Sequence, residues 1–244
     1  MILLADVGNS RQKWALGEGH ALGALGQVVN DDPGALAALL AGCPRAGLRR
    51  TVIASVAGES VNSLIREALA LARLPTAEFV ATPARAAGIL VGYDNPGQLG
   101  CDRFLAMVGA RARYPGPLVV ADCGTAVTLD AVDGDGRHLG GAILPGRRLM
   151  REALVHGTRG VRVEAIEVAE VFGHDTAAGV ASGSLYGLAG AIDGITARMS
   201  AALAEAPALV ITGGDATALE PLLKHRYHNH PDLVLEGLVK YADS

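Results

Sequence analysis

The sequence predicts an α/β protein of two related lobes, with parallel strands and helices on the faces of the sheets. Residues 3–10 read LLADVGNS and residues 119–126 read VVADCGTA, so an aliphatic pair, Ala-Asp, one residue, Gly and a small polar residue occur twice. This separation is far longer than the period of solenoid repeats, which indicates two lobes that begin alike. Strand, helix and strand patterns also alternate in the first half, an order typical of parallel sheets covered by helices.

The composition narrows the class of protein. Half of the 244 residues are hydrophobic and 19% are charged, which fits a packed globular protein and not a disordered one. The net charge of −4 argues against non-specific nucleic-acid binding. Cys43, Cys101 and Cys123 show no CxxC spacing, which argues against zinc and a disulfide framework. Because the N-terminus has no signal-peptide pattern and no apolar run reaches about 18 residues, we expect a cytoplasmic protein without a membrane partner.

The first lobe is expected to begin with strands. ILLADV, KWALG and a stretch ending in QVV predict two or three strands within residues 2–29. Asp32 is the expected N-cap of a short helix over residues 33–41, with Pro33 at its first position. The β-branched run TVIASVA predicts a buried strand over 51–57, and an apolar stripe over 61–72 predicts a helix.

A break in the chain marks the expected boundary between the lobes. Turn-forming residues 92–98 predict a loop, and a helix is expected from about Gly100 to Tyr114. Pro115-Gly116-Pro117 ends this helix immediately before the second Asp-x-Gly strand. The lobes are therefore expected to occupy residues 1–117 and 118–244.

The second lobe is expected to repeat the strand-and-helix plan. Its predicted elements are a hairpin closed by residues 133–136, the run LGGAILPG, a helix from about Arg147, a long helical region over 176–205, a strand that enters a turn over 208–216, and the closing segment DLVLEGLVKYA.

The second Asp-x-Gly turn has the residue types of a phosphate site. An apolar run ends at Asp122 and is followed by Gly124 and Thr125. Glycine permits backbone conformations that let N–H groups converge beside the carboxylate. A hydroxyl, N–H donors and a carboxylate together suit a phosphate and its metal ion. The alternative is an ordinary hairpin in which Asp and Gly only form the turn.

The first turn repeats this arrangement. Asp6 ends a strand, Gly8 forms the turn, and Asn9 and Ser10 offer side-chain contacts. Lys13 follows and is able to reach a terminal phosphate as a point charge, unless it is simply a solvated lysine. Two such turns predict a site that binds a nucleotide's phosphates and metal. The P-loop, dinucleotide and serine-hydrolase motifs are absent from the sequence.

Gly100-Cys101-Asp102-Arg103 stands at the predicted start of a helix. The amides and dipole of a helix start keep a carboxylate ionised, so Asp102 suits the acceptance of a hydroxyl proton in phosphoryl transfer. Arg103 suits an anionic group of the substrate. The alternative is a helix-terminal Asp beside a surface Arg.

Two further features are weaker. The Gly-Gly of ITGGDA (211–216) leaves room for an adenine or ribose, or it is a plain strand–helix turn. His225, His228 and His230 lack acidic or Cys company, which argues against a metal site.

Glycines recur in the long helical region at 179, 183, 187, 190 and 194. Residues four apart share a helix face, so these glycines form a stripe without side chains. Each glycine costs about 1 kcal/mol against alanine, which indicates close approach by another element. That element is either a second copy of the chain or the helix's own lobe.

With these residues in view, the chain resembles the type III pantothenate kinases of the acetate kinase, sugar kinase, Hsc70 and actin superfamily. Gly-x-Asp-Arg and Gly-Gly-x-Ile-x-Pro-Gly are the more specific motifs, and Ser10 stands where threonine is commoner. The matching segments, in the family's order, are DVGNSRQKW (6–14), YDNPGQLGCDRF (93–104), ADCGTAVTLD (121–130), GGAILPG (140–146), DTAAGVASG (175–183) and ITGGDA (211–216).

The resemblance implies ATP-dependent phosphorylation of the primary hydroxyl of pantothenate, the first step of coenzyme A biosynthesis. It implies two ribonuclease-H-like lobes with mixed five-stranded sheets around a nucleotide cleft, and a homodimer with a composite active site. It implies Asp102 as the catalytic base, magnesium near Asp6, and potassium or ammonium at Asp122. The implied ATP-binding residues are Asp6, Val7, Gly8, Asn9, Ser10, Arg11, Gln12, Lys13 and Thr125. The implied pantothenate-binding residues are Tyr93, Gly100, Cys101, Asp102, Arg103 and Thr176.

Two other functions stay open from the sequence. Another small-metabolite kinase of the superfamily would keep both Asp-x-Gly turns but lack Gly-x-Asp-Arg. A non-catalytic, nucleotide-dependent regulator would keep the fold without a reason to retain Asp102 and Arg103 together. The second possibility matters because the family was also described through a relative thought to assist a virulence regulator. No role follows from the sequence for Arg147 or Arg148.

Overall fold

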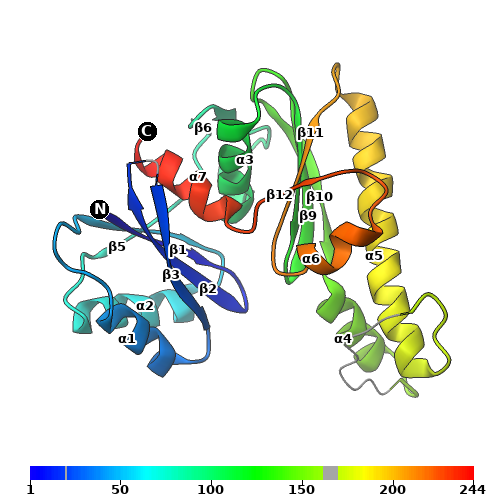
Figure 1. Cartoon of the computed structure of the whole chain (residues 1–244), viewed down its shortest axis with the longest axis horizontal. Helices are drawn as coiled ribbons and strands as arrows, with labels where there is room; N and C mark the ends of the chain where they lie inside the picture. Colours follow the sequence, from blue (N-terminus) through cyan, green and yellow to red (C-terminus); the bar gives the residue numbers. More distant parts are fainter. Residues whose placement is uncertain (20, 162–169) are drawn as a thin grey trace. The chain divides into compact units, whose positions relative to one another are not determined.

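The computed structural model describes residues 1–19, 21–161 and 170–244. The chain forms two compact units, each with one five-stranded sheet (Figure 1). The first unit comprises Met1–Pro115, Gly136–His138 and Asp232–Ser244, and the second comprises Gly116–Asp135 and Leu139–Pro231. Residues 136–138 and 232–244 therefore belong to the first unit although they follow the lobe boundary expected at residue 117.

The sheet of the first unit has the order β3-β2-β1-β4-β5. β1 pairs antiparallel with β2 and parallel with β4, β2 pairs antiparallel with β3, and β4 pairs parallel with β5, so the sheet is mixed. The two or three strands expected within residues 2–29 are three in the structure. The strands are β1 (Ile2–Val7), β2 (Arg11–Glu18), β3 (Ala21–Val29), β4 (Arg50–Ser55) and β5 (Ala77–Phe79).

Two helices cover one face of this sheet. They are α1 (Pro33–Ala41) and α2 (Glu59–Leu71). Asp32 caps α1 as predicted, because its Oδ1 accepts a hydrogen bond of 2.8 Å from the N–H of Ala35. Period-two alternation in β1 directs alternate side chains to this face, where Leu3, Ala5 and Val7 join the core formed with Leu36, Leu40, Ile65 and Leu69.

Helices α3 (Cys101–Arg113) and α7 (Leu233–Ala242) pack against each other in the same unit (Figure 1). Their backbones meet at Gly109 and Gly237, where no side chain separates them. The Phe104 and Tyr241 rings make an edge contact with centroids 6.0 Å apart. This close approach brings the end of the chain back to the first unit.

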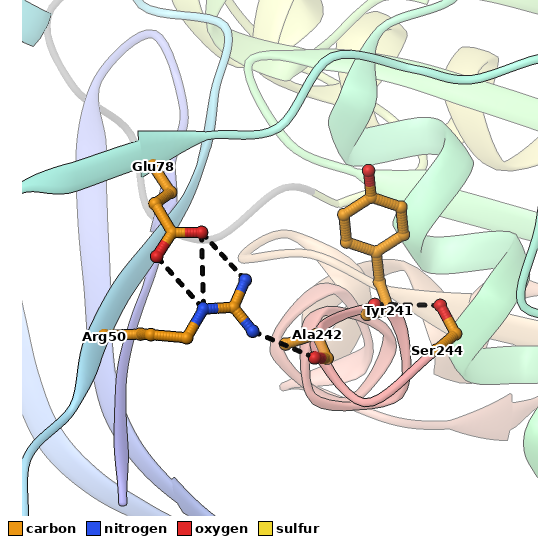
Figure 2. A network of polar contacts seen from close by, with 5 residues as sticks. All are labelled: Arg50, Glu78, Tyr241, Ala242 and Ser244. Atoms are coloured by element: carbon orange, nitrogen blue, oxygen red, sulfur yellow. Dashed lines mark hydrogen bonds and ion pairs between the residues drawn. The ribbon is translucent and has the colours of Figure 1, made fainter.

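The end of α7 is also fixed to the first sheet. The Arg50 guanidinium binds both Glu78 oxygens, with its Nη2 2.8 Å from Oε2, and donates from Nη1 to the Ala242 carbonyl at 3.1 Å. Figure 2 shows this network, in which Arg50 of β4 lies between Glu78 of β5 and the last turn of α7. The Ser244 hydroxyl closes that turn on the Tyr241 carbonyl at 2.9 Å.

A small ribbon precedes α3. It consists of β6 (Arg85–Ala86) and β7 (Ile89–Leu90), followed by a short 3-10 turn, η1 (Pro96–Gln98). Residues 136–138 pair with this ribbon, since the Leu90 N–H donates to the Gly136 carbonyl at 2.9 Å. Gly136 has a φ of +84°, and a Cβ there would overlap the Gly88 carbonyl, so only glycine fits this approach.

The second sheet has the order β10-β9-β8-β11-β12, which matches the first strand for strand. β8 pairs antiparallel with β9 and parallel with β11, as β1 does with β2 and β4. The expectation of mixed five-stranded sheets in two lobes that begin alike is thereby confirmed. The strands are β8 (Leu118–Cys123), β9 (Ala126–Val132), β10 (His138–Pro145), β11 (Ala208–Thr212) and β12 (His228–Asn229).

Two helices of the second unit lie where the sequence predicted them, α4 (Arg147–Gly157) and α5 (Thr176–Ala202). The short helix α6 (Ala216–Leu219) and the 3-10 turn η2 (Glu220–Leu222) were not predicted. The buried face of α5 packs Leu185, Leu188 and Ile192 against the sheet. Within α5, the Asp193 carboxylate accepts hydrogen bonds from the N–H groups of Lys224 and His225, at 2.9 and 3.4 Å. No helix in the described ranges is long and apolar enough to cross a membrane.

Candidate active site

The first Asp-x-Gly turn lies at the carboxyl end of β1. Asp6 is the penultimate residue of this strand and stands opposite Lys13 in the register with β2. The Gly8 N–H donates to the Arg11 carbonyl at 3.0 Å and closes the turn. Asn9, Ser10 and Arg11 are exposed. The turn therefore presents polar side chains beside a carboxylate, which suits a phosphate site.

Asn30 braces this turn and was not found from the sequence. Its Nδ2 donates to the Gly8 carbonyl at 2.7 Å, and its N–H donates to the Ser10 carbonyl at 3.1 Å. The sequence signal is only an asparagine directly after the third strand, and this residue type is common in turns. Its contact with Gly8 depends on the pairing of β2 with β3.

Three residues of the 6–13 segment have other local contacts. Val7 is fully buried in the core, and Gln12 is 2% exposed, with its Oε1 accepting a hydrogen bond of 3.1 Å from the Trp14 indole N–H. The Lys13 ammonium lies 3.4 Å from Oδ1 of Asp232, the residue that precedes α7. Val7 and Gln12 thus turn their side chains inward.

The second Asp-x-Gly turn has the same construction. Asp122 is the penultimate residue of β8, and the Gly124 N–H donates to the Ala126 carbonyl at 3.0 Å. Two glycines pack closely against this turn. A Cβ on Gly146 would overlap the Gly124 and Thr125 carbonyls, and a Cβ on Gly213 would lie 2.6 Å from Asp122 Oδ1. The start of α4 and the turn after β11 therefore converge on this point.

The start of α3 places Asp102 beside the first turn. The Cys101 Sγ donates to the Ser55 carbonyl at 3.5 Å, and Ser55 pairs with Val7 at the end of β1. Asp102 Oδ1 accepts a hydrogen bond of 2.7 Å from the Arg103 N–H. A Cβ on Gly100 would lie 2.5 Å from that oxygen, so the carboxylate occupies the space that glycine leaves free.

Arg103 is directed toward Tyr93. Arg103 is 6% exposed, and its Nη1 donates to the Tyr93 hydroxyl at 3.2 Å. The Tyr93 ring in turn packs against the ring of His138, with centroids 5.5 Å apart, and His138 is fully buried. The sequence did not point to His138, because its proximity to Tyr93 depends on residues 136–138 joining the first unit.

Cys101 has no nucleophilic role at neutral pH. Burial and, after it, the neighbouring Asp102 carboxylate raise the pKa of its thiol to about 11. A thiol with this pKa remains neutral, and the thiolate is the reactive form. Cys101 therefore acts by packing and by its hydrogen bond to Ser55.

The remaining predicted residues lie in the second unit. Thr176 is the exposed first residue of α5, next to the N-cap Asp175, whose Oδ1 accepts a hydrogen bond of 2.7 Å from the Ala178 N–H. The structure thus brings Asp6, Tyr93 and residues 100–103 together in the first unit, whereas Asp122, Thr125 and Thr176 belong to the second. Among the described residues, no group of three or more His, Cys, Asp or Glu is arranged to hold a metal ion. His225, His228 and His230 are among the residues to which this applies.

The chain is similar in sequence to known type III pantothenate kinases. The family model for type III pantothenate kinase matches residues 2–198. A type III pantothenate kinase of Nitrosococcus oceani is 37% identical, over 99% of this chain and 94% of its own length. One of Alkalilimnicola ehrlichii is 40% identical, over 98% of this chain and 97% of its own length.

Solved structures share the fold. A Campylobacter jejuni protein described as a Baf family transcriptional activator superposes with a TM-score of 0.61 at 21% identity, covering 99% of this chain and 97% of its own. A glucokinase from an Antarctic psychrotroph superposes with a TM-score of 0.51 at 12% identity, covering 100% and 99%. These likenesses confirm the predicted fold of two actin-like lobes. The family model over residues 2–198 and the relatives at 37% and 40% identity show that the chain belongs to the type III pantothenate kinase family.

Proposed function

We propose that this protein transfers the γ-phosphoryl group of ATP to the primary hydroxyl of pantothenate, the first step of coenzyme A biosynthesis. The observation that carries the proposal is the position of Asp102 and Arg103 at the start of α3, next to the Asp6 turn. This supports the proposal because a carboxylate suited to accept a proton and a guanidinium suited to an anionic substrate group lie beside a phosphate-type turn. Phosphoryl transfer depends mainly on such positioning and charge stabilisation.

Asp102 is the proposed base. Its carboxylate is held by the Arg103 N–H at 2.7 Å and by its place in the first turn of α3, where the helix dipole favours negative charge. An oriented carboxylate accepts the proton of the attacking hydroxyl as the new P–O bond forms. Gly100 leaves the space that this orientation needs.

Arg103 and Tyr93 are proposed to bind the carboxylate of pantothenate. A guanidinium offers a planar set of donors that matches a carboxylate, and the Tyr93 hydroxyl holds this one at 3.2 Å. Cys101, Gly100 and Thr176 complete the proposed pantothenate-binding set. Residues 6–13 and Thr125 form the proposed ATP-binding set.

The donor atoms of the two turns fit two kinds of cation. Mg²⁺ usually binds one or two carboxylates together with substrate phosphates, and Asp6 offers one carboxylate in a turn with Ser10. Asp122 offers oxygen ligands at a strand end, which fits a potassium or ammonium ion. When bound, such cations neutralise charge on the phosphates during transfer.

The glycine stripe of α5 supports a homodimer. A Cβ on Gly179, Gly183, Gly187 or Gly190 would meet nothing within 4 Å in the described part of the chain, and all four glycines are exposed. The helix's own lobe therefore does not occupy this face there. We infer that a second copy packs on it, and that Thr176 reaches the partner's substrate site to form a composite active site.

The test is a coupled assay with purified protein, ATP and a panel of small hydroxylated metabolites. Pantothenate is expected to be the preferred acceptor, whereas preference for another metabolite would favour a different kinase of the superfamily. Asp102→Asn is expected to lower kcat by about 10²- to 10⁴-fold while ATP binding persists. Nucleotide binding without any kinase activity in the wild type would favour the regulatory alternative.

A further inference from the structure

Arg147 is the first residue of α4, and its position depends on the second Asp-x-Gly turn. Gly146, immediately before it, donates its N–H to the Thr125 carbonyl at 3.0 Å, and a Cβ on Gly146 would overlap the Gly124 and Thr125 carbonyls. Because both sides of this contact are backbone, α4 cannot shift away without breaking it. The backbone of Arg147 is therefore fixed close to the Thr125 turn, because the preceding residue, Gly146, contacts it directly.

The Arg147 guanidinium is largely buried and poorly paired. Its side chain is 14% exposed, and its Nε is buried without a hydrogen-bond partner in the described ranges. The nearest carboxylate recorded for it is Asp215, with Nη1 and Oδ1 4.0 Å apart. The arginines at 50, 66, 113 and 148 instead lie 2.5 to 2.8 Å from their carboxylates. A buried cation without close acceptors is costly, and an anion brought to it would lower that cost.

Asp215 belongs to the same point in the second unit. Its N–H donates to the Cys123 carbonyl at 2.9 Å, directly beside the Asp122 turn. Gly213, two residues earlier, has a φ of +95° and would place a Cβ 2.6 Å from Asp122 Oδ1. The turn after β8, at residues 122–125, is thus surrounded by the end of β11 and the start of α4. Arg147 brings a positive charge to this turn.

We propose that Arg147 binds a phosphate oxygen of the nucleotide at the Thr125 turn, and that Asp215 holds its side chain at long range until the nucleotide arrives. This inference rests on the proposed function, since it assigns the ATP phosphates to that turn. A guanidinium is always charged and matches phosphate oxygens in a fixed fork, whereas a lysine acts only as a point charge. Arg147 is then a binding residue for the phosphoryl donor and has no part in pantothenate recognition.

The experiment compares Arg147→Ala and Arg147→Lys with a matched control, Arg148→Ala. Arg148 is the next residue of the same helix turn, but its side chain is 54% exposed and pairs with Glu152. Affinities for ATP and adenosine are measured by calorimetry without pantothenate, and the KM for pantothenate is measured separately. Thermal unfolding establishes that each variant is folded.

Arg147→Ala is expected to weaken ATP binding about 10- to 100-fold, the loss typical of a hydrogen bond to a charged group. In Arg147→Ala, the affinity for adenosine and the KM for pantothenate are expected to stay within twofold of the wild type. The ATP affinity of Arg147→Lys is expected to lie between those of the wild type and Arg147→Ala, and that of Arg148→Ala to match the wild type. The proposal is overturned if Arg147→Ala loses affinity equally for ATP and adenosine, or if only its KM for pantothenate changes. It is also overturned if the ATP affinity of Arg147→Ala equals that of Arg148→Ala. Because nucleotide binding is measured alone, a wild type that binds ATP but does not phosphorylate pantothenate contradicts the proposed function and leaves this inference standing.

Discussion

Replacing Gly237 with alanine is expected to destabilise the first unit, although alanine normally favours a helix. Gly237 lies in α7 where this helix meets α3, and a Cβ there would overlap the Leu105 carbonyl and lie 3.1 Å from the Gly109 nitrogen. All of these atoms are backbone, so no change of rotamer relieves the overlap. The two helices must move apart for the methyl group to fit.

The size of the effect follows from two opposing contributions to the free energy of unfolding. Alanine in place of glycine in a helix interior contributes about 1 kcal/mol in favour of folding. Overpacking costs about 1–3 kcal/mol, and a backbone-to-backbone contact belongs at the upper end of this range because it cannot relax locally. The net expectation is about 2 kcal/mol of destabilisation, which lowers the Tm of a chain of this length by about 4–8 °C.

Thermal unfolding of Gly237→Ala is compared with Gly34→Ala as a control. Gly34 is exposed in α1, and a Cβ there would make only an ordinary contact of 3.4 Å with Asp32 Oδ1. The control is expected to keep or raise the Tm. Since α3 carries Asp102, Gly237→Ala should also lower kcat/KM for pantothenate when activity is assayed at a temperature well below the Tm of the variant. A Tm equal to or above that of the wild type, with full activity, would refute the reasoning.

Three further predictions concern the site. Activity with magnesium present should fall when potassium or ammonium is replaced by sodium if a monovalent ion binds at Asp122; full activity in sodium alone would contradict that site. Mixing Asp102→Asn with a Thr176 variant impaired in pantothenate binding should restore part of the activity through heterodimers with one intact site, and no recovery after verified subunit exchange would exclude the composite site. His138→Ala should raise the KM for pantothenate several-fold without changing the KM for ATP, because the His138 ring packs against the Tyr93 ring with centroids 5.5 Å apart. If this ring contact is the cause, His138→Phe should restore the KM for pantothenate. An unchanged KM for pantothenate in His138→Ala would reject this role.

The sequence by itself determined most of the elements and both phosphate-type turns. Asp32 and Pro33 predicted the start of α1, and the β-branched run over 51–57 predicted β4, because caps and alternation are local properties of the chain. The repeated Asp-x-Gly pattern predicted two lobes that begin alike, and the two sheets share one strand order. The short strands β5, β6, β7 and β12 were not predicted, since two or three residues carry no periodicity.

The site was predicted in part for the same reason. The residues of each turn and of the α3 start are neighbours in sequence, so their chemistry could be inferred from motif and resemblance. Asn30 and Arg147 could not be assigned, because the first depends on strand pairing and the second on burial beside a turn 22 residues earlier in the chain. The inward orientation of Gln12 likewise depends on its contact with Trp14 in the folded sheet.

Only the tertiary structure decided which parts of the chain pack together. Residues 232–244 return to the first unit because Gly109 and Gly237 let two helix backbones touch, and residues 136–138 do so because Gly136 fits against Gly88. In both cases the contact joins residues far apart in the chain and depends on the absence of a side chain. Local sequence patterns report the propensities of one segment, whereas such contacts depend on the shapes of two segments at once.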